Sequence, residues 1–328
     1  MTNYLISRRQ WVAGELISGY KPRFFHPHKT LLYEMAYSKK QQSDGIIGYS
    51  RWMPRGLPEK LPSRKAPLSI SQKTGFFDYL PSTQAGLAEW HLNFANYDVY
   101  STWAASLFAQ DEMQVAEHPG LMALRMAATK EGLTMLCVED GEPTPILVTG
   151  IERRLSIDTS SNADRPNGLY GNQFKRAWPE QIEAATTVFD APLKSNLIAI
   201  EAPAEGTGSY SEEEIIFILR TAYAGFTAAR DESLAVLGSN DIVIHTGFWG
   251  CGAYGGNRVL MTLLQMVAAD MAGVIQIIFH VGDKAGDAPF DEALEAYRLF
   301  RNDSAMTTDG MIKVLADRHY SWGESDGN

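Results

Sequence analysis

The sequence predicts an α/β fold, in which helices cover a buried sheet, preceded by an N-terminal accessory segment. Two kinds of segment support this fold class. Short runs such as 241–246 and 274–281 are almost continuously apolar, which is typical of strands buried on both faces. Longer segments with apolar residues at helical spacing alternate with these runs, as they do where helices pack on a sheet.

Residues 1–65 differ from the rest of the chain in charge. They hold 12 Lys/Arg against 4 Asp/Glu, and the remaining residues hold 17 against 35, so the net charge of −10 conceals a basic arm on an acidic body. Such an arm either contacts a polyanion, for instance a nucleic acid, or packs on its own acidic domain. Within it we expect a short helix at Leu31–Tyr37 and a proline-rich loop at Arg51–Pro58 and Pro62. A boundary near residue 65 divides the chain into 1–65 and 66–328.

Strands and helices are expected to alternate through residues 66–328. Ser211 is a predicted N-cap, because the carboxylates of Glu212–Glu214 suit the first turn of the helix that follows, and this helix should run to about Ala229. Further helices are expected at 107–126, 258–271 and 290–300. The expected strands are 90–95, 134–138, 145–149, 197–200, 241–246 and 274–281.

The composition excludes several classes of protein. Hydrophobic residues make up 45% of the 328 residues, which is ample for a buried core. No uncharged apolar stretch approaches the roughly 18 residues that a membrane span needs, and the first residues lack the apolar region of a signal peptide. Cys137 and Cys251 lie far apart, without metal-ligand spacing. We therefore expect a cytoplasmic protein, with the nucleus as the alternative location, and no membrane association.

The densest run of glycine lies between the strand expected to end at Thr246 and the helix expected to start near Arg258. Five of the ten residues 247–256 are glycine. A strand–loop–helix junction exposes backbone N–H groups and the positive end of a helix dipole, which suits a phosphate. The segment is neither a Walker A loop nor a dinucleotide fingerprint. Residues alone leave two interpretations open, a phosphate cradle or a tight turn.

The full string resembles one known family. Thr246-Gly-Phe-Trp-Gly-Cys-Gly-Ala-Tyr-Gly-Gly-Asn257 is similar to the diphosphate-binding segment T-G-N-W-G-C-G-A-F-G-G-D of the poly(ADP-ribose) glycohydrolases. Ala222–Phe226 and Phe279–Asp283 resemble two further family segments, A-Y-C-G-F and F-T-F-G-D, so the likeness spans roughly 66–300. It implies a macrodomain-like mixed sheet flanked by helices. It also implies ligand contacts at Gly247, Trp249, Gly250, Cys251, Gly252, Ala253, Tyr254 and Gly255.

The family's catalytic signature is F-A-N, then three glycines, then Q-E-E. Phe94-Ala-Asn96 is followed 14 residues later by Gln110-Asp111-Glu112, in register with that pattern. Cleaving a ribose glycosidic bond requires a proton on the leaving oxygen, which one carboxyl of raised pKa can supply before acting as base for water. The resemblance implies that Glu112 is this acid and base, that Asp111 orients the distal ribose, and that Asn96 and Gln110 belong to the ligand site.

One part of the signature is missing, because Tyr100-Ser101-Thr102 occupies the positions of the three glycines. This change removes the backbone's freedom to approach the ligand closely. It leaves three possibilities: a different ADP-ribosyl linkage, binding without hydrolysis, or a displaced loop with the usual reaction. We expect an ADP-ribosyl hydrolase acting on protein-linked mono- or poly-ADP-ribose, with a non-catalytic ADP-ribose-binding module as the alternative and an unrelated structural role as a third.

The adenine end of the site has weaker signals. By the same resemblance, Tyr170 or Phe174 covers the adenine ring and Asp78 binds its exocyclic amine. The expected partner is ADP-ribose or an ADP-ribosylated protein. The polyanion that residues 1–65 could contact is a nucleic acid or poly(ADP-ribose). No cofactor is required, and no metal is expected at His26 and His28, which lack nearby cysteines or acids. His245 and His280 end apolar strands and are expected to be hydrogen-bonded core histidines.

Overall fold

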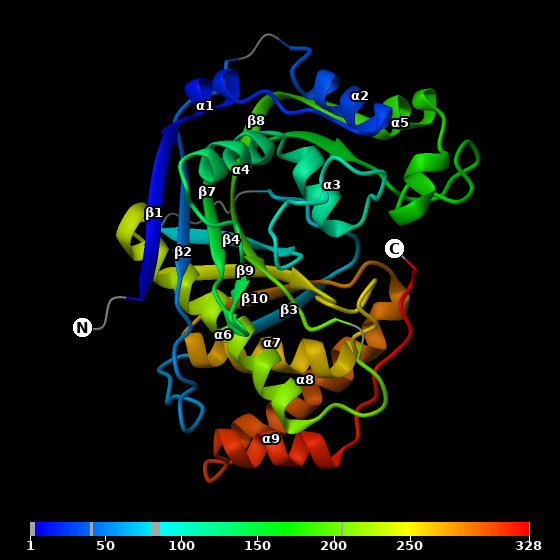
Figure 1. Ribbon diagram of the computed structural model, residues 1–328. Coiled ribbons are helices and arrows are strands. Elements are labelled where there is room, and N and C mark those ends of the chain that lie inside the picture. Colours follow the sequence, from blue (N-terminus) through cyan, green and yellow to red (C-terminus); the bar gives the residue numbers. More distant parts are fainter. Residues whose placement is uncertain (1–3, 40–41, 81–85, 205, 328) are drawn as a thin grey trace.

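A mixed eight-stranded sheet runs through the centre of the protein (Figure 1). We describe it from a computed structural model, which covers residues 4–39, 42–80, 86–204 and 206–327. The strand order is β1-β2-β7-β8-β4-β9-β10-β3. The strands are β1 Leu5–Val12, β2 Ile46–Trp52, β3 Ser69–Lys73, β4 Leu87–Phe94, β7 Ile146–Ile157, β8 Thr186–Ile200, β9 Asp241–Gly247 and β10 Gln276–His280, and β5 Val138–Glu139 pairs separately with β6 Glu142–Pro143.

The direction of the strands decides where a ligand site can form. β8, β4, β9, β10 and β3 are mutually parallel, whereas β1, β2 and β7 run antiparallel to their neighbours. Parallel strands place their carboxyl ends at one edge, and ligands of open α/β sheets bind there. The loops after β4, β8, β9 and β10 therefore meet at one edge of the sheet.

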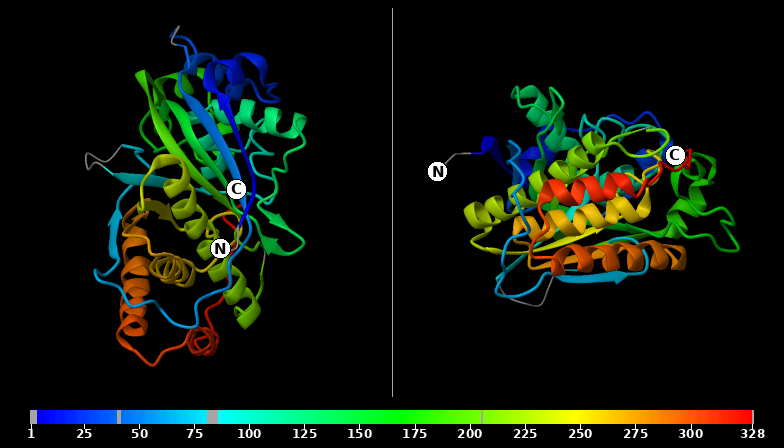
Figure 2. Two further views of the ribbon diagram at one scale, coloured as in Figure 1. Left: turned by 90° about the vertical axis from the view of Figure 1, so that its left-hand side faces the viewer. Right: turned by 90° about the horizontal axis from the view of Figure 1, so that it is seen from below.

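Helices cover both faces of the sheet, so the predicted α/β fold class is confirmed (Figure 1). One face carries α6 Glu212–Glu232, α7 Arg258–Ala272, α8 Asp287–Asn302 and α9 Thr308–Asp317. The other carries α1 Ala13–Gly19, α2 Pro27–Ala36, α3 Gln110–Glu117, α4 Gly120–Lys130 and α5 Pro179–Ala185, and the short helices are η1 Gly171–Arg176, η2 Ser233–Leu237 and η3 Lys284–Gly286. Of the C-terminal helices, the orange one (α8) packs on α7 and the red one (α9) on α6, and Figure 2 shows them from two further sides. None of the helices in the described ranges is long and apolar enough to span a bilayer.

Local signals account for the best-predicted helix. The Ser211 hydroxyl accepts a hydrogen bond from the backbone N–H of Glu214 at 3.2 Å, and the Glu214 carboxylate accepts one from the Ser211 N–H at 2.7 Å. This reciprocal capping satisfies two N–H groups that a helix start leaves free. The helix begins where predicted and continues to Glu232, three residues beyond the expected end.

The structure corrects two expected elements. Thr134–Val138 was expected as a strand, but only Val138 lies in one, the short β5. Its apolar residues Met135 and Cys137 are instead buried in the core beneath α4. Packing as a loop, not pairing in the sheet, explains the hydrophobicity of this run. Arg51 and Trp52, expected in a loop, complete β2 before the irregular segment begins.

The predicted accessory segment joins the main sheet, because β2 pairs with β7 in antiparallel register. The helix expected at Leu31–Tyr37 is confirmed as the second half of α2. Many of the segment's basic side chains pair with acids of the remaining chain, which favours packing on the acidic body over polyanion contact. These residues are Arg8, Arg9, Lys39, Arg51, Arg55 and Arg64. The boundary near residue 65 stays a prediction.

Candidate active site

The two motifs singled out in the sequence meet at the carboxyl ends of β4 and β9. Asn96, two residues beyond β4, donates from Nδ2 to the Tyr254 hydroxyl of the glycine-rich loop at 3.3 Å. Tyr254 in turn donates to Glu201 Oε1 at 3.3 Å, and Glu201 directly follows β8. Burial raises the pKa of Glu201, against the hydrogen bonds that it accepts from Tyr97 and Tyr254. Three adjacent strands thus contribute polar groups to one place.

Glu201 was missed in the sequence. The available signal was a single acid that directly follows the apolar run 197–200. An acid at the end of a parallel strand lies at the ligand edge of the sheet.

Glycine is needed in the loop for two different reasons. Gly250 has φ +75°, and a Cβ there would lie 2.5 Å from that of Ala202. At Gly247 a Cβ would lie 2.7 Å from the carbonyl oxygen of His280 on β10. The loop therefore folds tightly against the ends of β8 and β10, in a conformation that side chains would block.

Trp249 and Cys251 hold this loop in place from beneath. Trp249 is fully buried, and its Nε1 donates to the carbonyl oxygen of Ile200 at 3.2 Å. The Cys251 thiol donates to the carbonyl oxygen of Trp249 at 3.5 Å, and burial raises the thiol's pKa. After the loop, Asn257 caps α7 by accepting from the N–H groups of Val259 and Leu260. These side chains fix the shape of the loop.

The C-terminal segment lies across the glycine-rich loop, where its red trace reaches this edge of the sheet in Figure 1. The N–H of Gly323 donates to the Gly255 carbonyl oxygen at 2.7 Å, and that of Asp326 donates to the Gly252 carbonyl oxygen at 3.4 Å. Asp326 Oδ2 lies 3.1 Å from the position that a Cβ on Gly252 would take. A carboxylate therefore lies against the loop that is expected to hold the diphosphate.

The first three residues of α3 have distinct surroundings. Gln110 accepts from the Phe94 N–H at 2.8 Å and donates to the Leu92 carbonyl oxygen at 3.1 Å, which ties the helix to β4. Asp111 is buried and accepts from Asn93 Nδ2 at 2.9 Å. Burial, then the neighbouring Glu112, raises the pKa of Asp111.

Glu112 is 3% exposed, and both of its carboxylate oxygens have donors. Oε2 accepts from the Ala109 N–H at 3.1 Å, and Oε1 accepts from the Thr102 hydroxyl at 2.7 Å. Thr102 belongs to the segment that replaces the three glycines. The replacement therefore supplies a hydrogen-bond partner to the expected acid, which the sequence did not indicate.

Tyr100, in the same segment, keeps a backbone conformation that glycine favours. Its φ is +60°, and its ring is fully buried in the core between the sheet and α4. A bulky residue in this region is strained by about 1–3 kcal/mol. The segment accordingly turns as a glycine would turn, with its largest side chain directed into the core.

The residues expected around adenine lie in different environments. Phe174 is fully buried and stacks on Phe108 with ring centroids 4.1 Å apart, so it packs inside the protein. Tyr170 is partly exposed and stacks on Phe76 at 5.9 Å, and Phe76 is 52% exposed. The structure thus favours Tyr170 over Phe174 as the aromatic face and adds Phe76 beside it. The carboxylate of Asp78 pairs with Lys73 at 3.2 Å.

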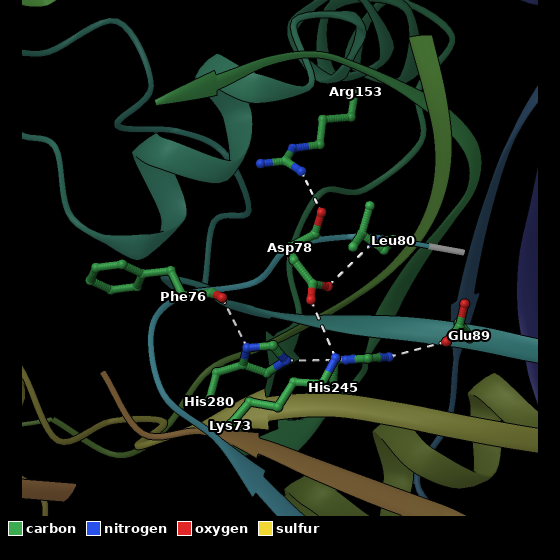
Figure 3. A network of polar contacts seen from close by, with 8 residues as sticks. All are labelled: Lys73, Phe76, Asp78, Leu80, Glu89, Arg153, His245 and His280. Carbon is green, nitrogen blue, oxygen red and sulfur yellow. Dashed lines mark hydrogen bonds and ion pairs between the residues drawn. The ribbon is translucent and has the colours of Figure 1, made fainter. Parts of the chain in front are cut away.

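A chain of hydrogen bonds connects the segment around Asp78 to the ends of β9 and β10 (Figure 3). His280 Nδ1 lies 2.9 Å from the Phe76 carbonyl oxygen, and its Nε2 lies 3.2 Å from His245 Nδ1. His245 Nε2 lies 3.4 Å from Glu89 Oε1. Both histidines are buried and hydrogen-bonded, as predicted. No group of three or more metal-ligating side chains is assembled within the described residues.

The mixed sheet, with its glycine-rich loop and acidic side chains at the carboxyl ends of parallel strands, defines a macrodomain-type fold. Residues 84–287 match the family model described as poly(ADP-ribose) glycohydrolase (PARG), macro domain fold. The match covers more than half of the chain, and the chain belongs to this family. The resemblance and the macrodomain-like fold predicted from the sequence are confirmed, and ADP-ribose glycohydrolase chemistry is the activity class of the family.

Solved structures of similar fold come from bacterial members. The enzyme from Thermomonospora curvata bound to the inhibitor ADP-HPD has 14% identity and a TM-score of 0.43, over 88% of this chain and 84% of that chain. The Deinococcus radiodurans enzyme in complex with ADP-ribose has 13% identity and a TM-score of 0.41, over 89% of this chain and 93% of that one. Its apo form has 11% identity and a TM-score of 0.38, over 89% and 92%. No curated protein matches the chain.

Proposed function

We propose that this protein hydrolyses the ribose glycosidic bond of protein-linked mono- or poly-ADP-ribose, with Glu112 as general acid and base. The contact between Asn96 and Tyr254 carries the proposal, because it brings the acid-bearing segment and the diphosphate loop to one edge of the sheet. The diphosphate and the distal ribose belong to one small ligand. A hydrolase must therefore bind the diphosphate and position the reacting ribose within a single site.

The chemistry follows from these positions. Backbone N–H groups of 247–256 hold the diphosphate, and Asn96 bonds the hydroxyls of the distal ribose. Protonated Glu112 gives its proton to the leaving oxygen as the bond from that oxygen to the ribose C1″ breaks. The carboxylate that remains then takes a proton from the water that attacks C1″. Thr102 can donate to Glu112 in the ionised state and accept from it in the protonated state.

A second function, ADP-ribose binding without turnover, is favoured by one observation. Glu112 is almost completely buried, and two donors already engage its oxygens. A carboxyl group whose oxygens are both engaged by Thr102 and by the N–H of Ala109 would stabilise the start of α3 and would not contact a substrate. The two functions share the diphosphate loop and differ only at the distal ribose.

Two measurements separate these functions. Calorimetry with ADP-ribose tests the shared site, and absence of binding at millimolar ligand would refute both. Release of ADP-ribose from mono- and poly-modified proteins is then compared for the native protein, Glu112→Gln and the control Glu183→Gln, an exposed residue of α5. We expect Glu112→Gln to bind ADP-ribose and lose release. Native binding without release would establish the binding module, and unchanged release by Glu112→Gln would remove Glu112 from the mechanism.

A further inference from the structure

Lys29 is a buried lysine next to the expected acid, although it comes from a distant part of the sequence. It lies on α2, outside the residues that match the family model. Its side chain is 3% exposed, and its Nζ has no hydrogen-bond acceptor within the described part of the chain. Nζ instead faces the rings of Phe108 and Phe174, at 4.9 and 5.6 Å from their centroids.

An ammonium in such a position requires electrostatic compensation. Burying a charged group is unfavourable unless nearby charges offset it, and the two aromatic faces offset only part of that cost. Burial lowers the pKa of Lys29 to about 8, while the charges of Glu112 and Asp111 act to raise it. The two acids at the start of α3 are therefore the compensating charges.

Lys29 and Glu112 also line one small cavity, together with apolar side chains of α2, α3 and α4. The cavity offers about 10 Å³ to the centre of a water molecule, which is about the space that one water needs. The apolar walls keep other counter-ions away from the pair.

The buried charges of Asp111, Glu112 and Lys29 sum to zero only if the two acids together hold one proton. With Asp111, Glu112 and Lys29 all ionised, the buried cluster carries one net negative charge, and a single proton on the two acids removes it. Arg125 of α4 also acts on Asp111, but its two terminal guanidinium nitrogens pair with Asp98, whose negative charge offsets it. Among the described residues, the other titratable groups next to the cluster are His26, Tyr33, Tyr100, Cys137 and Tyr170.

We propose that Lys29 is a positioning residue of the hydrolase site, whose ammonium is the buried counter-ion that holds the Asp111–Glu112 pair to one shared proton. This inference rests on the proposed function, in which that proton goes to the leaving oxygen. It also gives residues 1–65 a part in the reaction. Without the lysine the pair would take up its second proton at a higher pH, so the pH range in which exactly one proton is held would shift.

The direct test is a titration of the carboxyl pair by carbon NMR in the protein without substrate. We compare the native protein with Lys29→Met, which removes the charge, and Lys29→Arg, which keeps it. Leu32→Met, one turn along α2 on the same cavity, controls for altered packing. We expect Lys29→Met to raise the proton affinity of the pair at least tenfold, with the pH profile of hydrolysis moving the same way. The arginine and Leu32 variants should stay within about twofold of the native protein.

A reciprocal measurement guards against misfolding of the lysine variant. Glu112→Gln removes one of the compensating charges, so the lysine should lose its proton at lower pH, as followed by NMR of its ε carbon. Coincident carboxyl titrations of the native protein and Lys29→Met would overturn the proposal, as would a lysine titration unchanged by Glu112→Gln. If the native protein does not hydrolyse its substrates but both titrations shift, the proposed function fails and the counter-ion role stands.

Discussion

The C-terminal segment on the glycine-rich loop leads to a measurable prediction about affinity. Asp326 places a carboxylate against Gly252, where the diphosphate is expected to bind. Both anions need the same surface, so we expect the segment to compete with the ligand. The changes to make are Asp326→Asn and a deletion of residues 323–328. The deletion keeps Trp322, whose ring stacks on Tyr210 with centroids 4.3 Å apart and anchors the segment.

The size of the effect follows from distance and exposure. A diphosphate charge on this loop would lie on the order of 5 Å from the Asp326 carboxylate, where two like charges repel by about 1 kcal/mol in a water-like medium. The high-dielectric value applies because Asp326 is exposed. A loss of about 1 kcal/mol of repulsion tightens ADP-ribose binding about fivefold. The deletion removes the same carboxylate together with the segment that lies on Gly252 and Gly255, so it should tighten binding at least as much.

Calorimetry with ADP-ribose at low and high salt measures this effect. Glu324→Gln is the matched control, because it removes the same charge from an exposed neighbour whose backbone, not its side chain, approaches the loop. We expect at most about a twofold change for the control and a smaller effect of Asp326→Asn in about 1 M salt, where exposed charges are screened. Weaker binding by the deletion variant would refute competition and make the segment a wall of the site.

Three further predictions concern single side chains. Burial lowers the pKa of His118 to about 3 and that of His280 to about 4. Between those values and about 6.5 the unfolded chain binds more protons than the folded protein, so the free energy of unfolding should fall by about 2 kcal/mol per histidine from pH 7 to pH 5. In urea titrations His280→Gln should make the free energy of unfolding depend less on pH. The Tyr100 hydroxyl is buried without a partner among the described residues, so Tyr100→Phe should raise the free energy of unfolding by about 1–2 kcal/mol, and lower stability would contradict this. Thr102→Val removes a 2.7 Å hydrogen bond to Glu112, so kcat should fall about tenfold with KM unchanged, and an equal loss in KM would assign Thr102 to binding instead.

Apolar runs and capping residues correctly predicted the elements that depend on local sequence. The strand at β9, the helix α7 and the capped start of α6 follow from apolar runs and from Ser211, and all three are observed. Thr134–Val138 failed because an apolar run shows burial and does not show which surface buries it. The strands β1 and β3 contain no fully buried residue, so neither forms an apolar run that predicts a buried strand.

Site residues that lie within sequence motifs could be predicted, whereas residues that only tertiary packing brings to the site could not. Asn96 and Tyr254 were expected in one site, and they are in hydrogen-bond contact. Trp249 and Gln110 were expected at the ligand, whereas their side chains bond the ends of β8 and β4. Lys29, like the C-terminal segment, reaches the site only through tertiary packing, which no local pattern reports.

The segment that replaces the three glycines raises one chemical question, which concerns the proton of the expected acid Glu112. Tyr100 adopts a left-handed turn with its ring in the core, so the replacement segment uses a backbone conformation that glycine favours. What does change is the surroundings of the acid, because Thr102 bonds Glu112 and Lys29 lies across a small cavity from it. The proposed hydrolysis therefore depends on the proton shared between Asp111 and Glu112 as well as on the fit of the ligand to the loop.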